Sequence, residues 1–120
     1  MHLRCLLVDD NDAFLNAASV LLEREGVTVA GIASTIAEAL RQIEALRPDV
    51  ILIDIGLGDE SGFDLARRVA RNGSGATMIM ISTRAEADYA DLIAEGPAAG
   101  FLAKSELSAR GIGQLYGHMP

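Results

Sequence analysis

Short apolar runs recur along the chain and alternate with segments whose apolar residues follow helical spacing. The apolar runs cover residues 3–8, 27–32, 50–53, 78–81 and 98–102. Runs of this length, bounded by polar residues and glycines, are typical of buried β-strands. We therefore predict a strand over each of them.

The segments between these runs have apolar residues at intervals of three or four positions, as amphipathic helices do. These helical segments are marked by Phe14, Ala18, Leu21 and Leu22; by Ile36, Leu40 and Ile43; by Leu65, Ala66 and Val69; and by Tyr89, Leu92 and Ile93. Thr35 and Glu38 form a capping-box pattern at the start of the second segment. Near the end of the chain, Gly111, Gly113 and Gly117 disfavour a helix, so we expect the last one to be short or frayed.

Strands that alternate with helices predict an α/β fold with a parallel sheet and helices on both of its faces. Strands buried on both sides have continuously apolar sequences, which fits the five runs. In such folds, ligands bind at the carboxyl ends of the strands. The residues that follow each run are therefore the candidates for chemistry.

Polar side chains stand at these strand ends. They are Asp9 and Asp10 after the first run, Asp54 after the third, Ser82 and Thr83 after the fourth, and Lys104 after the fifth. Taken singly, each has an ordinary structural interpretation: the acids as helix-start or turn residues, the hydroxyls as helix caps, the lysine as a solvated charge. Their joint placement at one edge of a sheet favours a functional site.

Carboxylates brought this close repel one another, by about 4 kcal/mol per close pair at a surface-like dielectric, so a cation must offset them. Mg²⁺ prefers oxygen ligands and is commonly held by one or two carboxylates together with a phosphate. A carboxylate beside Mg²⁺ and an ammonium group can attack phosphorus, which makes Asp54 a candidate nucleophile. The sequence has nine arginines and one lysine, Lys104, which suggests that this position needs a compact point charge.

Length and composition limit the interpretation further. The 120 residues suffice for one domain, over residues 1–120, and the net charge of -7 argues against nucleic-acid binding. No apolar stretch approaches the roughly 18 residues of a membrane span, and no signal peptide is recognisable, so we expect a cytoplasmic protein without membrane contact. Cys5, the single cysteine, lies within an apolar run and is expected to be a core residue.

Four motifs together resemble the receiver domain of bacterial two-component response regulators. They read VDD at 8–10, ILIDIGLGDESGFDL at 51–65, MIMIS at 78–82 and GFLAKSEL at 100–107. The resemblance covers essentially the whole chain. It implies a flavodoxin-like (βα)5 three-layer sandwich with a five-stranded parallel sheet in the order 2-1-3-4-5.

The resemblance also implies roles for individual residues. It makes Asp54 the phosphoacceptor, with Asp9, Asp10, Asp54 and the backbone carbonyl of Gly56 holding Mg²⁺. It makes Ser82 the switch hydroxyl, Thr83 a residue controlling access to the phosphoryl group, Lys104 the contact to the phosphoryl group and Asp54, and Phe101 the switch aromatic.

By the same resemblance, a sensor histidine kinase or phosphotransfer protein supplies the phosphoryl group. The surface of the fourth helix, fifth strand and fifth helix then changes for a downstream protein or a separate output domain, and it can also support a homodimer. The protein is expected to be a switch rather than an enzyme, with only self-directed phosphotransfer and autodephosphorylation. The segment KSEL at 104–107 is similar to the corresponding segment of receiver domains that precede helix-turn-helix output domains.

Three residues depart from the family pattern. Gly58 and Ser105 stand where proline is usual, which is expected to loosen the loop after Asp54 and to disfavour a cis peptide after Lys104. Thr83 replaces a smaller residue and is expected to narrow access to the phosphoryl group.

Other functions fit the sequence less well. A degenerate receiver acting as a constitutive interaction module would not need the full set of acids, hydroxyl and lysine. An excised receiver of a DNA-binding regulator remains an alternative. A nucleotide hydrolase would need a glycine-rich phosphate loop, whereas DDNDAF follows Val8, and an aspartate-nucleophile hydrolase would need a second acid where Gly56 stands.

Overall fold

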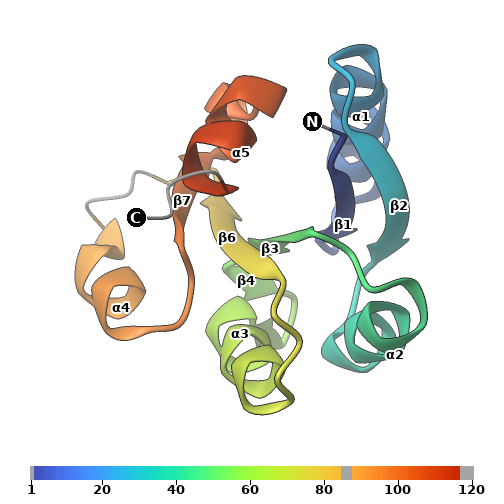
Figure 1. Cartoon of the computed structure of the whole chain (residues 1–120). Helices are drawn as coiled ribbons and strands as arrows, with labels where there is room; N and C mark the ends of the chain where they lie inside the picture. Colours follow the sequence, from blue (N-terminus) through green and yellow to red (C-terminus); the bar gives the residue numbers. More distant parts are fainter. Residues whose placement is uncertain (1, 85–87, 117–120) are drawn as a thin grey trace.

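A parallel sheet of five strands forms the middle layer of the protein in the computed structural model, which describes residues 2–84 and 88–116 (Figure 1). Its strands are β1 (Arg4–Val8), β2 (Thr28–Ala33), β3 (Val50–Asp54), β6 (Thr77–Ser82) and β7 (Gly100–Ala103). They are arranged in the order β2-β1-β3-β6-β7, and every neighbouring pair is parallel.

This order confirms the predicted 2-1-3-4-5 arrangement, with β6 and β7 as the fourth and fifth predicted strands. The numbering differs because two short strands follow β3, β4 (Gly56–Leu57) and β5 (Glu60–Ser61), which pair only with each other as an antiparallel hairpin. The sequence pattern did not reveal this hairpin, because each of its strands has only two residues.

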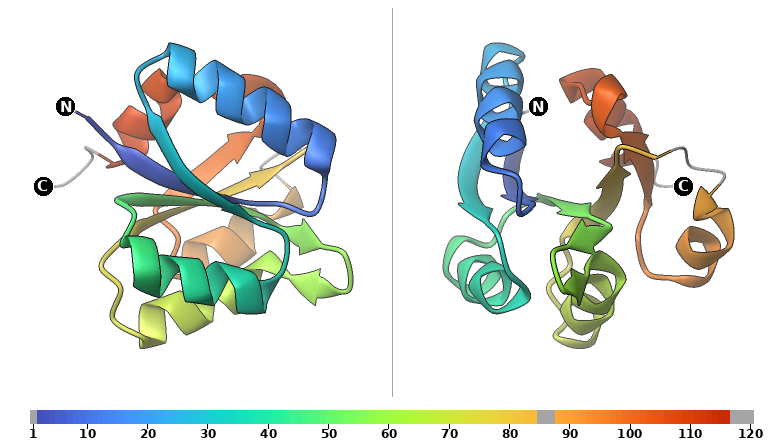
Figure 2. Two further views of the ribbon diagram at one scale, coloured as in Figure 1. Left: turned by 90° about the vertical axis from the view of Figure 1, so that its right-hand side faces the viewer. Right: turned by 180° about the vertical axis from the view of Figure 1, so that it is seen from behind.

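Helices cover both faces of the sheet, as predicted. They are α1 (Asp12–Arg24), α2 (Ile36–Leu46), α3 (Gly62–Arg71), α4 (Ala90–Glu95) and α5 (Ala109–Tyr116), with a 3-10 turn at Lys104–Glu106. Figure 2 shows α1 and α5 on one face and α2, α3 and α4 on the other. None of the helices in the described ranges is long and apolar enough to cross a membrane.

Alternate residues of each central strand enter two separate cores. In β1, Leu6 and Val8 pack towards α2 and α3, whereas Cys5 and Leu7 pack towards α1 and α5. This two-sided burial explains the continuously apolar sequences of β1, β3 and β6. The edge strands differ from the prediction: most residues of β2 and all four of β7 are only half-buried, because one side of each strand lacks a neighbour.

Cys5 is fully buried within the sheet, as expected for a core residue. Burial, with a smaller contribution from Glu23, raises the pKa of its thiol to about 12. A thiol with this pKa is protonated at neutral pH and unreactive.

Side-chain caps start three helices, one of them at the capping box predicted from Thr35 and Glu38. The Thr35 hydroxyl accepts a hydrogen bond from the Glu38 N–H at 3.1 Å, and the Glu38 carboxylate reaches back to the Ser34 N–H, one residue before the position that a standard capping box uses. Asn11 and Ser61 cap α1 and α3 in the same manner. The last helix, α5, has eight residues, and Gly117 lies outside the described residues.

Candidate functional site

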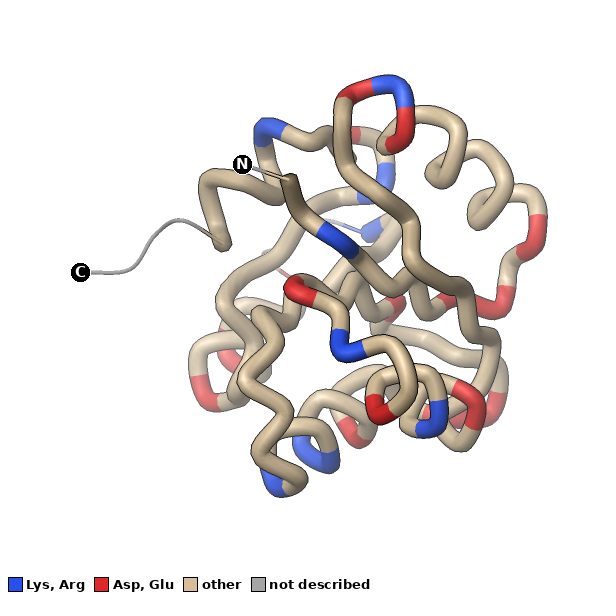
Figure 3. The backbone as a smooth tube through the Cα atoms, turned by 45° about the vertical axis from the view of Figure 1, so that its right-hand side comes forward, with Lys and Arg blue, Asp and Glu red and all other residues tan. Residues whose placement is uncertain are grey.

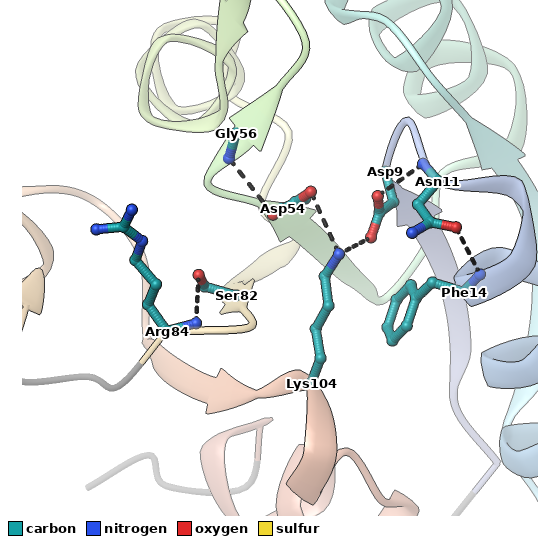
Figure 4. Close-up of polar contacts among 8 residues, drawn as sticks. All are labelled: Asp9, Asn11, Phe14, Asp54, Gly56, Ser82, Arg84 and Lys104. Carbon is teal, nitrogen blue, oxygen red and sulfur yellow. Dashed lines mark hydrogen bonds and ion pairs between the residues drawn. The ribbon is translucent and has the colours of Figure 1, made fainter.

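The polar residues predicted from the strand ends converge at one edge of the sheet (Figure 4). Asp9 directly follows β1, Asp54 and Ser82 are the last residues of β3 and β6, and Lys104 directly follows β7. Because the strands are parallel, their carboxyl ends meet at the same edge. The fold therefore places three charged side chains and a hydroxyl from distant parts of the sequence around one point.

Lys104 links the two buried acids of this site. Its ammonium nitrogen Nζ lies 2.6 Å from Asp9 Oδ2 and 3.4 Å from Asp54 Oδ2. The Lys104 side chain is 12% exposed, so both ion pairs lie largely out of solvent, where charges interact more strongly than at a surface.

Asp9 is completely buried, and the start of α1 fixes its orientation. Its Oδ1 accepts a hydrogen bond of 2.9 Å from the Asn11 N–H. Its Oδ2 has no aligned hydrogen-bond donor in the described part of the chain, although the Lys104 ammonium lies close to it. A buried carboxylate oxygen in this state can take a cation as a ligand.

The carboxylates of Asp9, Asp10 and Asp54 fit a divalent metal ion. One oxygen from each lies within 4.8 Å of the others. Asp9 and Asp54 are buried, whereas Asp10 is exposed and leaves one side of the cluster open to water. An all-oxygen donor set with an open side suits an ion such as Mg²⁺, which keeps several of its water ligands.

Asp54 is held in an environment that disfavours its charge. The residue is 8% exposed, and burial, followed by the negative charge of Asp9, raises the pKa of Asp54 to about 6. The Lys104 ammonium acts in the opposite direction but does not outweigh these two effects. Asp54 is therefore mostly ionised at neutral pH, as a nucleophile must be, but at a cost in folding free energy.

The segment after Asp54 is ordered by close backbone contacts. The Gly56 N–H donates to Asp54 Oδ1 at 3.4 Å, and the Gly62 N–H donates to the Ile55 carbonyl at 2.8 Å. A Cβ atom at Gly62 would lie 2.1 Å from the Asp54 carbonyl oxygen, so only glycine fits there.

Gly58 occupies the turn of the β4–β5 hairpin with a φ of 63°. Proline cannot adopt this φ. The turn of the hairpin therefore explains why glycine replaces the proline of the family pattern at position 58. In the structure this loop is a paired hairpin, and its loosening by Gly58 remains a prediction.

The remaining predicted residues lie around the site with different exposures. Ser82 is buried, and its hydroxyl accepts a 3.0 Å hydrogen bond from the Arg84 N–H. Thr83 is exposed beside it, and Phe101 on β7 is half-buried against the core that α2, α3 and α4 cover. No peptide bond in the described ranges is cis, in agreement with the expectation for Ser105.

Three contributors to the site were not predicted from the sequence. Asn11 donates from its backbone to Asp9, the Phe14 ring lies next to Lys104, and Glu60 on β5 accepts a 2.9 Å hydrogen bond from the Ile36 N–H of α2. The contact that each of them makes cannot be inferred from the spacing of residues in the sequence. Only Asn11, as a helix-start residue directly after two acids, carried a recognisable signal.

Acidic and basic positions are interspersed along the visible helices (Figure 3). Glu23 and Arg24 end α1, for example, and Glu25 directly follows them. Nucleic-acid binding by phosphate contacts needs basic residues clustered on one face. The expected lack of direct nucleic-acid binding remains a prediction.

Comparisons with known proteins give matches to response regulators and their receiver domains. The sequence profile of the response regulator receiver domain family matches residues 5–113. The DNA-binding response regulator MtrA from Mycolicibacterium smegmatis is 33% identical over 78% of this chain, which aligns with 39% of MtrA. The chain spans between 39% and 59% of the length of the curated relatives it matches, so these relatives are longer proteins.

Solved structures match over nearly the whole chain. A CheY-like response regulator receiver domain protein from Methanospirillum hungatei superposes with a TM-score of 0.77 and 28% identity, covering 93% of this chain and 88% of that one. A response regulator protein from Burkholderia pseudomallei, solved with a phosphorylated aspartic acid, a calcium ion and citrate, superposes with a TM-score of 0.80 and 27% identity, covering 93% and 65%.

Proposed function

The chain belongs to the response regulator receiver domain family of two-component phosphorelay signalling, and we propose from this premise that Asp54 is its phosphoacceptor. One observation carries the proposal: Asp54 ends a central strand, with oxygens of Asp9 and Asp10 within 4.8 Å and the Lys104 ammonium at 3.4 Å. This arrangement joins a nucleophilic carboxylate, a cluster for a divalent cation and a fixed positive charge.

The proposed donor is a phosphohistidine on a sensor histidine kinase or phosphotransfer protein. A carboxylate oxygen of Asp54 attacks phosphorus, and a P–O bond forms as the P–N bond breaks. The electron pair of the P–N bond remains on the imidazole nitrogen, which is then protonated by solvent. Later attack by water on the acyl phosphate releases inorganic phosphate and restores the carboxylate, so the only chemistry proposed is self-directed.

Asp9, Asp10 and Asp54, with the backbone carbonyl of Gly56, would hold Mg²⁺. When bound, Mg²⁺ supplies positive charge that offsets the charge on the phosphoryl oxygens during transfer. The Lys104 ammonium contributes a second positive charge beside Asp54. Exposure of Asp10 keeps the entry side open, and exposed Thr83 borders the approach of the donor.

The proposed switch begins at Ser82. The Ser82 hydroxyl now accepts from the Arg84 N–H, and in the proposed switch it moves from that partner to donate to a phosphoryl oxygen on Asp54. We propose that Phe101 then turns inward and changes the surface formed by α4, β7 and α5. That surface would contact a downstream protein, an output domain or a second copy of the chain.

A second proposal concerns the whole protein. MtrA is named a DNA-binding response regulator, and the chain matches only 39% of its length. The chain is then the receiver part of a longer regulator, and phosphorylation of Asp54 controls an output domain in the same polypeptide. The chemistry at Asp54 is the same in both cases.

Incubation with Mg²⁺ and an acyl phosphate donor such as acetyl phosphate, followed by intact mass analysis, tests the proposal. We expect the parent protein to gain one phosphoryl group and the Asp54→Asn variant to gain none. Asp59→Asn is the matched control, because it removes an exposed carboxylate from the neighbouring hairpin and should be modified like the parent. Equal modification of Asp54→Asn and the parent would show that another residue is the acceptor.

A further inference from the structure

The Lys104 ammonium has an aromatic neighbour in addition to its two carboxylate partners. Its Nζ lies 4.4 Å from the centroid of the Phe14 ring, on the side that faces α1 (Figure 4). A cation this close to an aromatic face is attracted by the negative potential of the ring. Lys104 is thus held by Asp9, Asp54 and Phe14 together.

Phe14 is fixed by the same segment that orients Asp9. The Phe14 N–H donates to Asn11 Oδ1 at 3.1 Å, and the Asn11 N–H donates to Asp9 Oδ1 at 2.9 Å. Because Lys104 contacts both Asp9 and Phe14, these contacts form a closed ring of four residues. The position of the Phe14 ring is therefore coupled to the position of the buried acid.

The three partners of Lys104 differ in what else they bind. Asp9 and Asp54 are among the candidate ligands of the divalent ion, and Asp54 is the proposed phosphoacceptor. A cation bound by these carboxylates would compete with the ammonium for their oxygens. The Phe14 ring is neutral and offers no ligand to a metal ion or a phosphoryl group, so neither would compete with Lys104 for it.

We propose that Phe14 is a positioning residue for phosphotransfer, whose ring holds the Lys104 ammonium beside Asp54 while the carboxylates bind metal. This inference rests on the proposed function of Asp54. It assigns to Phe14, in the first turn of α1, the role of holding the Lys104 ammonium next to the acidic pair that precedes the helix.

The single lysine permits a direct structural test. Every lysine side-chain signal in an NMR spectrum belongs to Lys104, and the ring current of Phe14 should shift its ε-methylene protons upfield. We expect Phe14→Leu and Phe14→Met, which remove the ring, to move this signal towards the value of an unstructured lysine. Phe14→Tyr keeps the ring and should keep the shift, and Val20→Ala, at an exposed apolar position of the same helix, should leave it unchanged.

The same variants test the role in phosphotransfer. With Mg²⁺ and acetyl phosphate, Phe14→Leu and Phe14→Met should slow modification of Asp54 by about two- to tenfold, the range expected for loss of one cation–π contact. Phe14→Tyr should restore the rate of the parent, and Val20→Ala should match it. A residue that only fills space would not require an aromatic ring for this rescue.

The two proposals fail in different ways. If the parent is phosphorylated and Phe14→Leu shows either the parent's Lys104 shift or the parent's rate, the role of Phe14 is refuted and that of Asp54 stands. If the parent takes no phosphoryl group under these conditions, the proposed function fails and the role of Phe14 falls with it.

Discussion

Asp54 carries its negative charge in a nearly closed site, and two of its charged neighbours, Asp9 and Lys104, act on that charge in opposite directions. Asp9 disfavours the ionised form and Lys104 favours it, while burial adds the largest effect against the charge. The pKa of Asp54 rises in consequence from an ordinary value of 3.8 to about 6. A group with this shift destabilises the folded protein whenever it is ionised.

This shift gives a prediction for stability as a function of pH. Between pH 3.8 and about 6, the folded state binds the Asp54 proton more tightly than the unfolded state, so this residue's contribution to stability falls as pH rises. Without divalent metal, Asp54→Asn should be more stable than the parent at pH 7, by on the order of 1–3 kcal/mol. The difference should shrink below pH 6 and disappear at about pH 3 and below, where Asp54 is mostly protonated in both states.

Urea denaturation of both proteins at several pH values measures this difference. Asp59→Asn serves as the control, since Asp59 is exposed and its replacement should change stability little at any pH. An Asp54→Asn variant that is less stable than the parent at pH 7 would contradict the assigned environment.

Ser82 gives a second prediction at the residue scale. Its hydroxyl accepts from the Arg84 N–H, and in the proposed switch this hydrogen bond is lost as the hydroxyl moves to a phosphoryl group. The Arg84 amide signal should therefore shift, and its hydrogen should exchange faster, on phosphorylation of the parent. In Ser82→Ala the Arg84 amide hydrogen should already exchange fast, and its signal should respond little to phosphorylation. An unchanged Arg84 amide signal in the phosphorylated parent would show that the Ser82 hydroxyl does not leave Arg84.

At the scale of elements, the β4–β5 hairpin joins the Asp54 site to the start of α2. Glu60 on β5 accepts a hydrogen bond from the Ile36 N–H, the first backbone donor of α2, although the two residues are 24 positions apart. Helix N-termini have unpaired donors, so Glu60 acts as a cap supplied from another element. The hairpin and α2 are thus coupled by one side chain.

Removal of the hydrogen bond between the Ile36 N–H and Glu60 should destabilise the protein at the start of α2. Glu60→Ala is expected to lose about 0.5–2 kcal/mol of unfolding free energy, as for a helix cap, and to speed hydrogen exchange at Ile36. Glu60→Gln keeps an acceptor oxygen and should retain most of both properties. Asp59→Ala removes the neighbouring negative charge but leaves the Glu60–Ile36 hydrogen bond in place. If Asp59→Ala lost as much stability as Glu60→Ala, the effect would come from charge rather than from capping.

At the scale of the whole molecule, the fold could be predicted from hydrophobic patterns that repeat along the whole sequence. The apolar runs of β1, β3 and β6 and the helical spacing between them suffice to predict a parallel sheet, and the strand ends then bring Asp9, Asp54 and Lys104 together. The hairpin, the Phe14 contact and the Glu60 cap were not predictable. They depend on single side chains meeting across the fold, which no periodicity encodes.

The same acidic cluster predicts a response of the whole protein to Mg²⁺. Binding to the folded state alone adds about 1.4 kcal/mol at an ion concentration ten times the dissociation constant. At roughly 4–8 °C per kcal/mol for a domain near this size, the melting temperature should rise by about 6–11 °C. Asp10→Asn should abolish the rise without unfolding the protein, because Asp10 is exposed. Asp12→Asn, two residues away on α1 and outside the cluster, should keep it.

The most direct test of the central claim is to identify the residue that carries the phosphoryl group. The parent protein is incubated with Mg²⁺ and acetyl phosphate, cleaved rapidly, and its modified peptide sequenced by tandem mass spectrometry. We predict a single phosphorylated position, Asp54, with no modification when Mg²⁺ is replaced by a chelator. Modification at another residue, or none at Asp54 in protein shown to be folded and to bind Mg²⁺, would contradict the assignment of this site.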